Sequence, residues 1–456
     1  MGSRDYWVPE NFIEALRRKI PGFKDETAQH QTRLAHYAWL AGTSRRKHRD
    51  LDGYMSIGHM DLEGSFGRGG FKAINERLAM FEVTGNWSLA KNLTKGYRLT
   101  DSVQAVKAKY LNQITPKLTH LISLDGKAMR TLPAALASKD MDEVTATAWK
   151  EAKPLNAIPV DLKRMVELRD HLEQMPANKS GHLFENATSE DVAYRLEILG
   201  QLIKLAQTTV AGKGFIAHRY AEGRTGRLYA RGISLQTAPR IIRKAALHGL
   251  YDYDIENCHY AIFYQLAERY GHECRGIKHY LTHKKATREG IALRVGISQE
   301  QVKTCLLALM FGARLTDFES NAIPDEIGQV KAMALYLDAE FAAIAEDITE
   351  GRRVILKNWP RRRTTLLNDM KKAVGLKAKP EVRLAHIIQG IEAKALWAAI
   401  RLYPDDVVLL MHDGFVATRE LDVTLIENAI YQETGYRLEL DGGLITLPAD
   451  LDFSKP

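Results

Sequence analysis

The stretch GLYDYDIENCHYAIF, residues 249–263, places three carboxylates at the end of an apolar run. Asp252, Asp254 and Glu256 occupy alternating positions, so in a β-strand all three would point to one face. Carboxylates this close repel one another and raise each other's pKa. Asp254 could instead cap the helix predicted after it, since Asp is a good N-cap. Three acidic residues in alternation beside an arginine-rich segment favour a metal site over a cap.

The composition indicates a folded, basic protein, either with a polyanionic partner or without one. The chain has 456 residues, enough for roughly two to four domains. Its content of 45% apolar and 26% charged residues is typical of globular proteins and excludes wholesale disorder. The net charge of +8 and the pI of about 9.1 favour a partner such as nucleic acid.

The cysteines and the hydropathy pattern indicate the cellular compartment in which we expect the protein. Cys258, Cys274 and Cys305 are odd in number and include no CxxC pair, which indicates neither a disulfide framework nor a zinc site. No apolar run approaches membrane-spanning length. We therefore expect a protein of the reducing cytoplasm with no membrane partner.

The first part of the chain has the pattern of a small separate domain. Residues 55–99 predict a short helix, a glycine-rich turn, a second helix around 71–80 and two strands joined by a polar hairpin. This order is typical of a winged helix, a module that docks nucleic acid or protein. The alternative is a structural domain of the same topology. Residues 103–210 are predicted to be mainly helical.

An arginine-rich stretch, RTGRLYARGISLQTAPRIIRKA at residues 224–245, ends just before the acidic run. Its arginines could hold phosphates or a duplex through bidentate hydrogen bonds. Arginine-rich loops are also common on basic proteins, so the stretch alone indicates little. The arginines concerned are Arg224, Arg227, Arg240 and Arg243.

Two later stretches carry further candidate residues. Residues 296–315, GISQEQVKTCLLALMFGARL, predict a helix that bears Lys303 and ends near Phe311. Residues 406–421, DVVLLMHDGFVATREL, predict two apolar strands joined by a tight turn that contains Asp413. A lone helical lysine is usually solvated, and Asp-Gly is also an ordinary hairpin turn pair.

Taken in chain order, these stretches resemble a known family. The series TGRL…LQ…PR..R, a strand ending in Asp, K-x7-(Y/F)-G and a strand followed by His-Asp is similar to the palm and fingers of family A DNA polymerases. It is equally similar to the phage-type single-subunit RNA polymerases. Residues 384–400, LAHIIQGIEAKALWAAI, add a fifth match, with Gln389 in the place of the family's glutamine. The resemblance covers about residues 220–420.

The resemblance implies an α+β right-hand polymerase, with a palm sheet, helical fingers and a helical thumb, plus an N-terminal winged-helix-like domain. The expected parts are the N-terminal domain (1–102), a thumb-like region (103–210), the first part of the palm (211–264), the fingers (265–385) and the second part of the palm (386–456).

The resemblance also implies phosphodiester synthesis with two Mg²⁺ ions, Mn²⁺ being the alternative metal. Mg²⁺ prefers oxygen ligands, and the ligands implied are Asp254, Ile255 and Asp413. Lys303 would meet the charge of the triphosphate, so the catalytic residues expected are Asp254, Asp413 and Lys303. Asp252 is the alternative to Asp254, because in the DNA polymerases the catalytic Asp is often followed by Tyr, as Asp252 is here.

The nucleotide-binding positions depart from the family's pattern at three places. Gln299 stands where the family has Arg, so Arg294 or Lys285 could supply that charge. Phe311 stands where most relatives have Tyr. His259 occupies the position of the family's sugar selector, which is Glu in the DNA enzymes and Gly in the RNA enzymes. The nucleotide-binding residues expected are Lys303, Phe311, His259, Arg294 and Gln299.

The template-binding residues follow from the same motifs. Gly414 follows the His-Asp pair, where DNA polymerases of the family usually have Glu, and this favours an RNA enzyme. The nucleic-acid-binding residues expected are Arg224, Arg227, Arg240, Arg243, Gly312, Gln389 and His412.

The sequence therefore predicts a DNA-dependent RNA polymerase or primase of a phage or plasmid system, acting in the cytoplasm of a bacterial host. A compact DNA polymerase without proofreading is the first alternative. The second is a non-catalytic replication initiator or regulator with a degenerate palm. The expected partners are a DNA template, nucleoside triphosphates, nascent RNA or DNA, and replication or transcription proteins.

Overall fold

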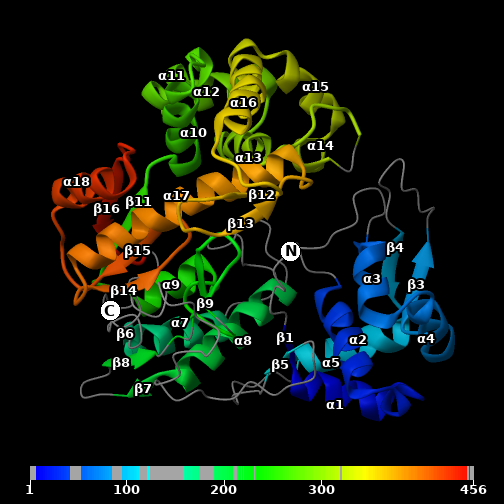
Figure 1. Cartoon of the computed structure of the whole chain (residues 1–456). Coiled ribbons are helices and arrows are strands. Elements are labelled where there is room, and N and C mark those ends of the chain that lie inside the picture. The colour runs from blue at the N-terminus through cyan, green and yellow to red at the C-terminus, as the bar shows by residue number, and fades with distance from the viewer. Residues whose placement is uncertain are drawn as a thin grey trace.

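A computed structural model shows an α+β protein in which helices predominate over small antiparallel sheets (Figure 1). The α+β class expected from the sequence is confirmed. No helix among the residues it describes is both long and apolar enough to cross a bilayer. The structure describes residues 7–41, 53–84, 95–112, 121–123, 158–174, 189–208, 213–216, 218, 220–230, 232–318, 321–448 and 451.

The N-terminal part has a hydrophobic core of its own, built around aromatic residues that include Phe12, Trp39 and Phe71. Strands β2, β4 and β3 form one antiparallel sheet in that order, and β1 pairs with β5. The elements are β1 (Trp7–Pro9), α1 (Glu10–Lys19), η1 (Phe23–Asp25), α2 (Ala28–Leu40), β2 (Met55–Ser56), α3 (His59–Phe66), α4 (Gly70–Leu78), β3 (Phe81–Thr84), β4 (Gly96–Leu99), α5 (Asp101–Asn112) and β5 (Leu121–Ser123).

Local sequence explains these elements. In α1, Phe12, Ile13 and Leu16 recur at helical spacing and are buried. Thr27 caps α2, its hydroxyl accepting the backbone N–H of His30. Helices α3 and α4 precede the strands β3 and β4, and the polar hairpin tip expected between those strands falls at residues 85–94, outside the described part.

A second group of elements covers one face of the central sheet, the four-stranded sheet that contains Asp254 and Gly414. Apolar residues of α7, α8 and α9 share a core with Val408 and Val416 of that sheet. Strands β6, β8 and β7 form a small antiparallel sheet beside them. The elements are β6 (Ile158–Asp161), α7 (Leu162–Gln174), α8 (Ser189–Leu205), β7 (Gln207–Thr208), β8 (Lys213–Ile216), β9 (Tyr220–Glu222), β10 (Leu228–Ala230) and α9 (Arg240–Ala246).

The central sheet has the strand order β14-β15-β11-β16 and is antiparallel throughout. In β11, Tyr253 and Ile255 are buried against the helices that follow, while Asp252 and Asp254 point to the other face. Segments far apart in the sequence therefore meet side by side. The strands are β11 (Tyr251–Ile255), β14 (Val407–Leu410), β15 (Gly414–Ala417) and β16 (Leu440–Leu444).

The remaining helices form the largest core with the opposite face of this sheet. Figure 1 shows α17 running along the sheet, with α10 to α16 gathered on its other side. The elements are α10 (Cys258–Arg269), α11 (Arg275–Thr282), α12 (Lys284–Val295), α13 (Gln299–Met310), α14 (Ala322–Ile327), α15 (Gln329–Leu337), α16 (Ala339–Asn358), β12 (Thr365–Leu367), β13 (Ala373–Gly375), α17 (Pro380–Leu402) and α18 (Val423–Thr434).

A buried histidine makes the stability of this fold depend on pH. His218 is buried, and its Nε2 accepts the backbone N–H of Leu235 at 3.0 Å. Burial lowers the pKa of His218 from 6.5 to about 3. The unfolded chain therefore binds a proton below about pH 6.5 that the folded chain excludes, so stability falls as the pH drops from 6.5 towards 3.

We predict that His218→Gln makes stability less dependent on pH. Between pH 7 and pH 5 the wild type should lose about 2 kcal/mol of unfolding free energy through this group alone, and the variant should not. Urea unfolding at both pH values measures the difference. His283→Gln, a change at an exposed histidine, is the control. The same pH dependence in the wild type and His218→Gln would contradict the assignment.

Candidate active site

The candidate site forms where two sequence-distant strands pair. On β11, Asp254 lies opposite Gly414 of β15. One residue further on, the backbone N–H of Ile255 donates to the carbonyl oxygen of Asp413 at 2.9 Å. The aspartates at the end of β11 and at the start of β15 are thus neighbours in space. This is the juxtaposition that the sequence motifs predict.

The close contact between β11 and β15 requires a glycine at position 414. A Cβ atom at position 414 would lie 2.1 Å from Oδ1 of Asp254 and 2.3 Å from the carbonyl oxygen of Tyr253. These distances are far below van der Waals contact, and one of the atoms belongs to the backbone. Gly414 is the first residue of β15, directly after the hairpin turn, and its carbonyl accepts the N–H of Met411 at 2.8 Å; its φ is not in the left-handed region that would itself call for glycine. The glycine therefore reflects packing between the two strands.

The neighbouring carboxylates at the β11–β15 pairing make one another harder to ionise. Partial removal from water, followed by the neighbouring charges of Asp252 and Asp413, raises the pKa of Asp254 to about 6. The pKa of Asp252 is also raised by removal from water, against the opposing effect of Arg243 and the other nearby cations. A bound cation would relieve this repulsion.

The register distinguishes the two β11 aspartates. Asp254 lies opposite Gly414, next to Asp413, whereas Asp252 lies opposite Val416, two residues further along the strand. Two residues in a strand span about 7 Å. On the other side of β11, Asp254 faces Asp441 of β16, a carboxylate that the sequence motifs do not identify. The register thus favours Asp254 over Asp252 as the partner of Asp413.

One expectation about the acidic run is wrong, and so is the less favoured alternative that Asp254 caps a helix. Glu256 does not share the face of Asp252 and Asp254, because β11 ends at Ile255 and the Glu256 carboxylate pairs with Lys284 of α12. Asp254 does not cap the following helix either, since the N-cap of α10 is Asn257 in a left-handed conformation with φ of 44°.

Ile255 contributes backbone and not side chain to this region. Its side chain is buried in the core of the helical layer. Its N–H is used by the hydrogen bond to Asp413. Only its carbonyl oxygen could therefore act as the metal ligand that the resemblance implies.

Helix α13 brings an aromatic residue to the start of α10. The helix begins after Ser298, which forms a capping box with Gln301. At its other end Phe311, 39% exposed, meets the ring of His259 edge to face, with 5.0 Å between the centroids. The hydroxyl of Tyr260 donates to the carbonyl of Leu306 at 2.8 Å and fixes the two helices together.

The other expected nucleotide ligands lie on the exposed sides of their helices. Lys303 is on the solvent side of α13 and pairs with Glu300 at 3.5 Å. Gln299 lies at the start of the same helix. The guanidinium of Arg294 is held by Asp338, at 2.6 Å, and by Glu340. Arg294 would have to leave these carboxylates to meet a triphosphate.

A buried carboxylate that sequence reasoning missed lies beside these residues. Glu392, in the middle of α17, has 0% exposure. It accepts two hydrogen bonds from Arg227, at 2.6 and 2.5 Å, and its Oε2 lies 2.8 Å from Nε2 of His259. Burial by itself would raise the pKa of Glu392, but the hydrogen bond from His259 and the charge of Arg227 bring it below its usual value. The sequence carries only a weak signal, because Glu392 stands between Ile391 and Ala393 but α17 also contains other charged residues.

This network changes the role expected for Arg227. The side chain is 9% exposed, and two of its nitrogens bind Glu392. The phosphate-binding role expected from the sequence needs a guanidinium open to solvent. Arg227 instead connects the loop between β9 and β10 to α17.

The other expected template ligands lie on several different elements. Arg224 lies exposed in the loop, Arg240 is exposed at the start of α9, and Arg243 donates to the carbonyl of Ala238. Gln389 is partly exposed one turn before Glu392. Gly312, after α13, has φ of 89°, and a Cβ there would lie 2.6 Å from Cβ of Glu381.

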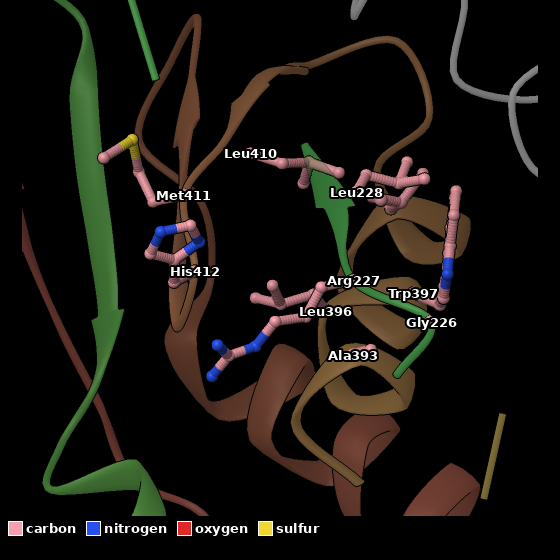
Figure 2. A pocket seen from close by; sticks show the side chains of 10 residues that line it. Gly226, Arg227, Leu228, Ala393, Leu396, Trp397, Leu410, Met411 and His412 are labelled. Atoms are coloured by element: carbon pink, nitrogen blue, oxygen red, sulfur yellow. The ribbon is translucent and has the colours of Figure 1, made fainter. Parts of the chain in front are cut away.

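A small pocket separates the loop from α17. Figure 2 shows the His412 ring and the Arg227 guanidinium towards one side of it and Trp397 towards the other. Its volume is about 10 Å³, enough for about one water molecule. The residues that line it are Gly226, Arg227, Leu228, Ala393, Leu396, Trp397, Ile400, Leu410, Met411 and His412.

The donor set fits magnesium at Asp254 and Asp413. Mg²⁺ is commonly held by one or two carboxylates and completes its shell with water and phosphate oxygens. Across the described ranges, one group of three candidate ligands has its atoms within 4.8 Å of one another: His272, Cys274 and Asp347. In that group the Asp347 carboxylate accepts the N–H of Ile277, so it caps α11 in the helical layer.

No family model and no curated protein matches the chain. Among solved structures it is similar to the polymerase domain of Pol1 from M. smegmatis, solved in complex with a DNA primer-template and dNTP. That superposition has a TM-score of 0.46 and 14% identity, and it covers 75% of this chain and 72% of the other. Because the likeness is this partial, the function proposed below rests on the side chains of this chain.

We predict that Gly414→Ala disrupts the pairing of β15 with β11. The new methyl group must displace backbone or the Asp254 carboxylate, and overpacking of this kind costs about 1–3 kcal/mol. Gly443→Ala is the matched control, since Gly443 lies on the other neighbour of β11 and a Cβ there meets nothing within 4 Å. Chemical denaturation of both variants measures the difference. Equal stability of the two would show that the close approach of Asp254 is wrong.

Proposed function

We propose that the protein is a template-directed nucleotidyltransferase, and that its palm, fingers and thumb correspond to the parts expected from the sequence. The observation that carries the proposal is the meeting of Asp254 and Asp413 at the β11–β15 pairing. Two carboxylates from separate strands, with a raised pKa at one of them, form the kind of site that holds magnesium.

The surrounding side chains suit the same reaction. When bound, magnesium would neutralise triphosphate charge and lower the pKa of the attacking hydroxyl. Asp254 and Asp413 would hold the cation where the two inner strands of the sheet, β11 and β15, meet. The exposed amine of Lys303 attracts the triphosphate. The contact between Phe311 and His259 provides a surface on which the nucleotide can lie.

The finer proposal is a DNA-dependent RNA polymerase or primase of a mobile element. With its Nε2 proton directed at Glu392, His259 could accept a hydrogen bond from a ribose hydroxyl through Nδ1, which supports use of ribonucleotides. Gly414 gives less support than its sequence position suggests, because packing against Asp254 already requires a glycine there. Incorporation of rNTPs and dNTPs, with and without a primer, tests this proposal. Exclusive use of dNTPs would make the protein a DNA polymerase.

We predict that Asp254→Ala and Asp413→Ala each abolish nucleotide addition on a primed template with Mg²⁺. Neither carboxylate needs to touch the template, so DNA binding measured by fluorescence anisotropy should stay within about threefold of wild type, a change of less than 1 kcal/mol. Asp252→Ala is the matched control on the same strand and should retain more activity.

Two outcomes would overturn this assignment of ligands, and a third would overturn the proposed function. Near-normal extension by Asp254→Ala or Asp413→Ala would show that the ligands are different. If Asp252→Ala is the more damaging change, the ligand is Asp252. A wild type that binds DNA but adds no nucleotide of either sugar would favour a non-catalytic initiator or regulator.

A further inference from the structure

The buried carboxylate of Glu392 joins three segments that are remote in sequence. It lies in α17 with 0% exposure. Arg227 reaches it from the loop between β9 and β10, and His259 reaches it from the first turn of α10. A carboxylate removed from water is strongly unfavourable unless its oxygens are paired. Here the two oxygens have partners from both of the other segments.

The network fixes how His259 is oriented. Nε2 of His259 lies 2.8 Å from Oε2 of Glu392 and 3.1 Å from Nη2 of Arg227. Because the carboxylate is the nearer group and can only accept, we assign the proton of the ring to this nitrogen. The ring itself packs edge to face on Phe311. With one nitrogen held by Glu392 and the ring held by Phe311, His259 has little rotational freedom.

The network also lies next to the paired aspartates. Ile255, three residues before Cys258, donates its backbone N–H to the carbonyl oxygen of Asp413 at 2.9 Å, so the start of α10 lies beside Asp413. Cys258 directly precedes His259, and its sulfur lies 3.9 Å from Oε2 of Glu392. The His259–Phe311 contact is therefore held close to Asp413.

We propose that Glu392 is the positioning residue for the nucleotide-binding side of the site, holding His259 against Phe311 so that the incoming nucleotide meets a preformed surface. The inference rests on the proposed function. Stability alone is a weak reason for such a group, because well-packed apolar side chains often replace buried ion pairs without loss. Correct placement of His259, however, requires a fixed acceptor at this distance.

The experiment uses Glu392→Gln, which keeps the size of the side chain and removes its charge. We expect KM for ATP and dATP opposite template thymine to rise about tenfold while kcat changes little, since the aspartates and Lys303 are intact. Glu392→Asp, which keeps the charge on a shorter side chain, should recover part of the loss. Asp347→Asn, a change at another buried carboxylate that caps α11, is the matched control and should leave KM unchanged.

A double variant separates positioning from folding. If Glu392 acts through His259, then His259→Ala with Glu392→Gln should raise KM no more than His259→Ala alone. Additive effects in this comparison would overturn the inference. So would an unchanged KM in Glu392→Gln together with a lowered melting temperature, which would leave Glu392 a purely structural role.

Calorimetric titration of ATP and dATP with Ca²⁺ in place of Mg²⁺ distinguishes the two proposals. If the wild type binds nucleotide but does not incorporate it, the proposed function fails. The positioning role of Glu392 is then tested by the affinity for nucleotide alone. About tenfold weaker nucleotide binding by Glu392→Gln than by the wild type supports that role. Equal affinity in wild type and variant overturns it. If the wild type binds no nucleotide, both proposals are wrong.

Discussion

The close approach of β15 to β11 is the contact on which the site depends. Asp254 and Gly414 pair so tightly that no side chain fits at position 414. The pairing joins a strand that follows the arginine-rich stretch to a strand near the C-terminus, and it sets Asp413 beside Asp254. Burial of Tyr253 and Ile255 on the opposite face keeps the two β11 aspartates pointing to one side. Packing of the sheet therefore imposes the electrostatic repulsion that a cation would relieve.

The Glu392 network provides the second constraint. Core packing holds α10 and α17 side by side, but apolar contacts alone leave side-chain rotations open. A buried carboxylate bound to Arg227 and near His259 restricts those rotations through directional hydrogen bonds. The two constraints meet near Cys258, whose thiol is influenced by both Glu392 and Asp413. The geometry of the site thus depends on polar contacts made inside an apolar core.

Short motifs in the sequence identified the strand with Asp254, the strand pair around Asp413 and the helix that ends before Phe311, because each follows from local periodicity and turn residues. The sequence could not show that Glu256 leaves the cluster, since the end of β11 and the position of Lys284 depend on tertiary packing. For the same reason Arg227 was expected at the surface. The pairing of Glu392 with Arg227 spans a long stretch of chain that no local pattern describes.

The sequence alone also could not show why position 414 is a glycine. A glycine after an aspartate is consistent with a turn, with an RNA enzyme of the resembled family or with a close contact between strands, and only the register of β15 against β11 reveals the close contact. The α+β class, by contrast, followed from alternating strand-like and helical runs. Local signals therefore predicted these strands and helices, whereas the partners of charged groups required the structure, and the roles of the candidate residues stay predictions.

The most direct test of the central claim is an anomalous difference map from crystals of the full chain soaked in Mn²⁺, which takes the same oxygen ligands as Mg²⁺. The account predicts a peak between the carboxylates of Asp254 and Asp413. A peak only at His272, Cys274 and Asp347, or none at the β11–β15 junction at millimolar Mn²⁺, would contradict it.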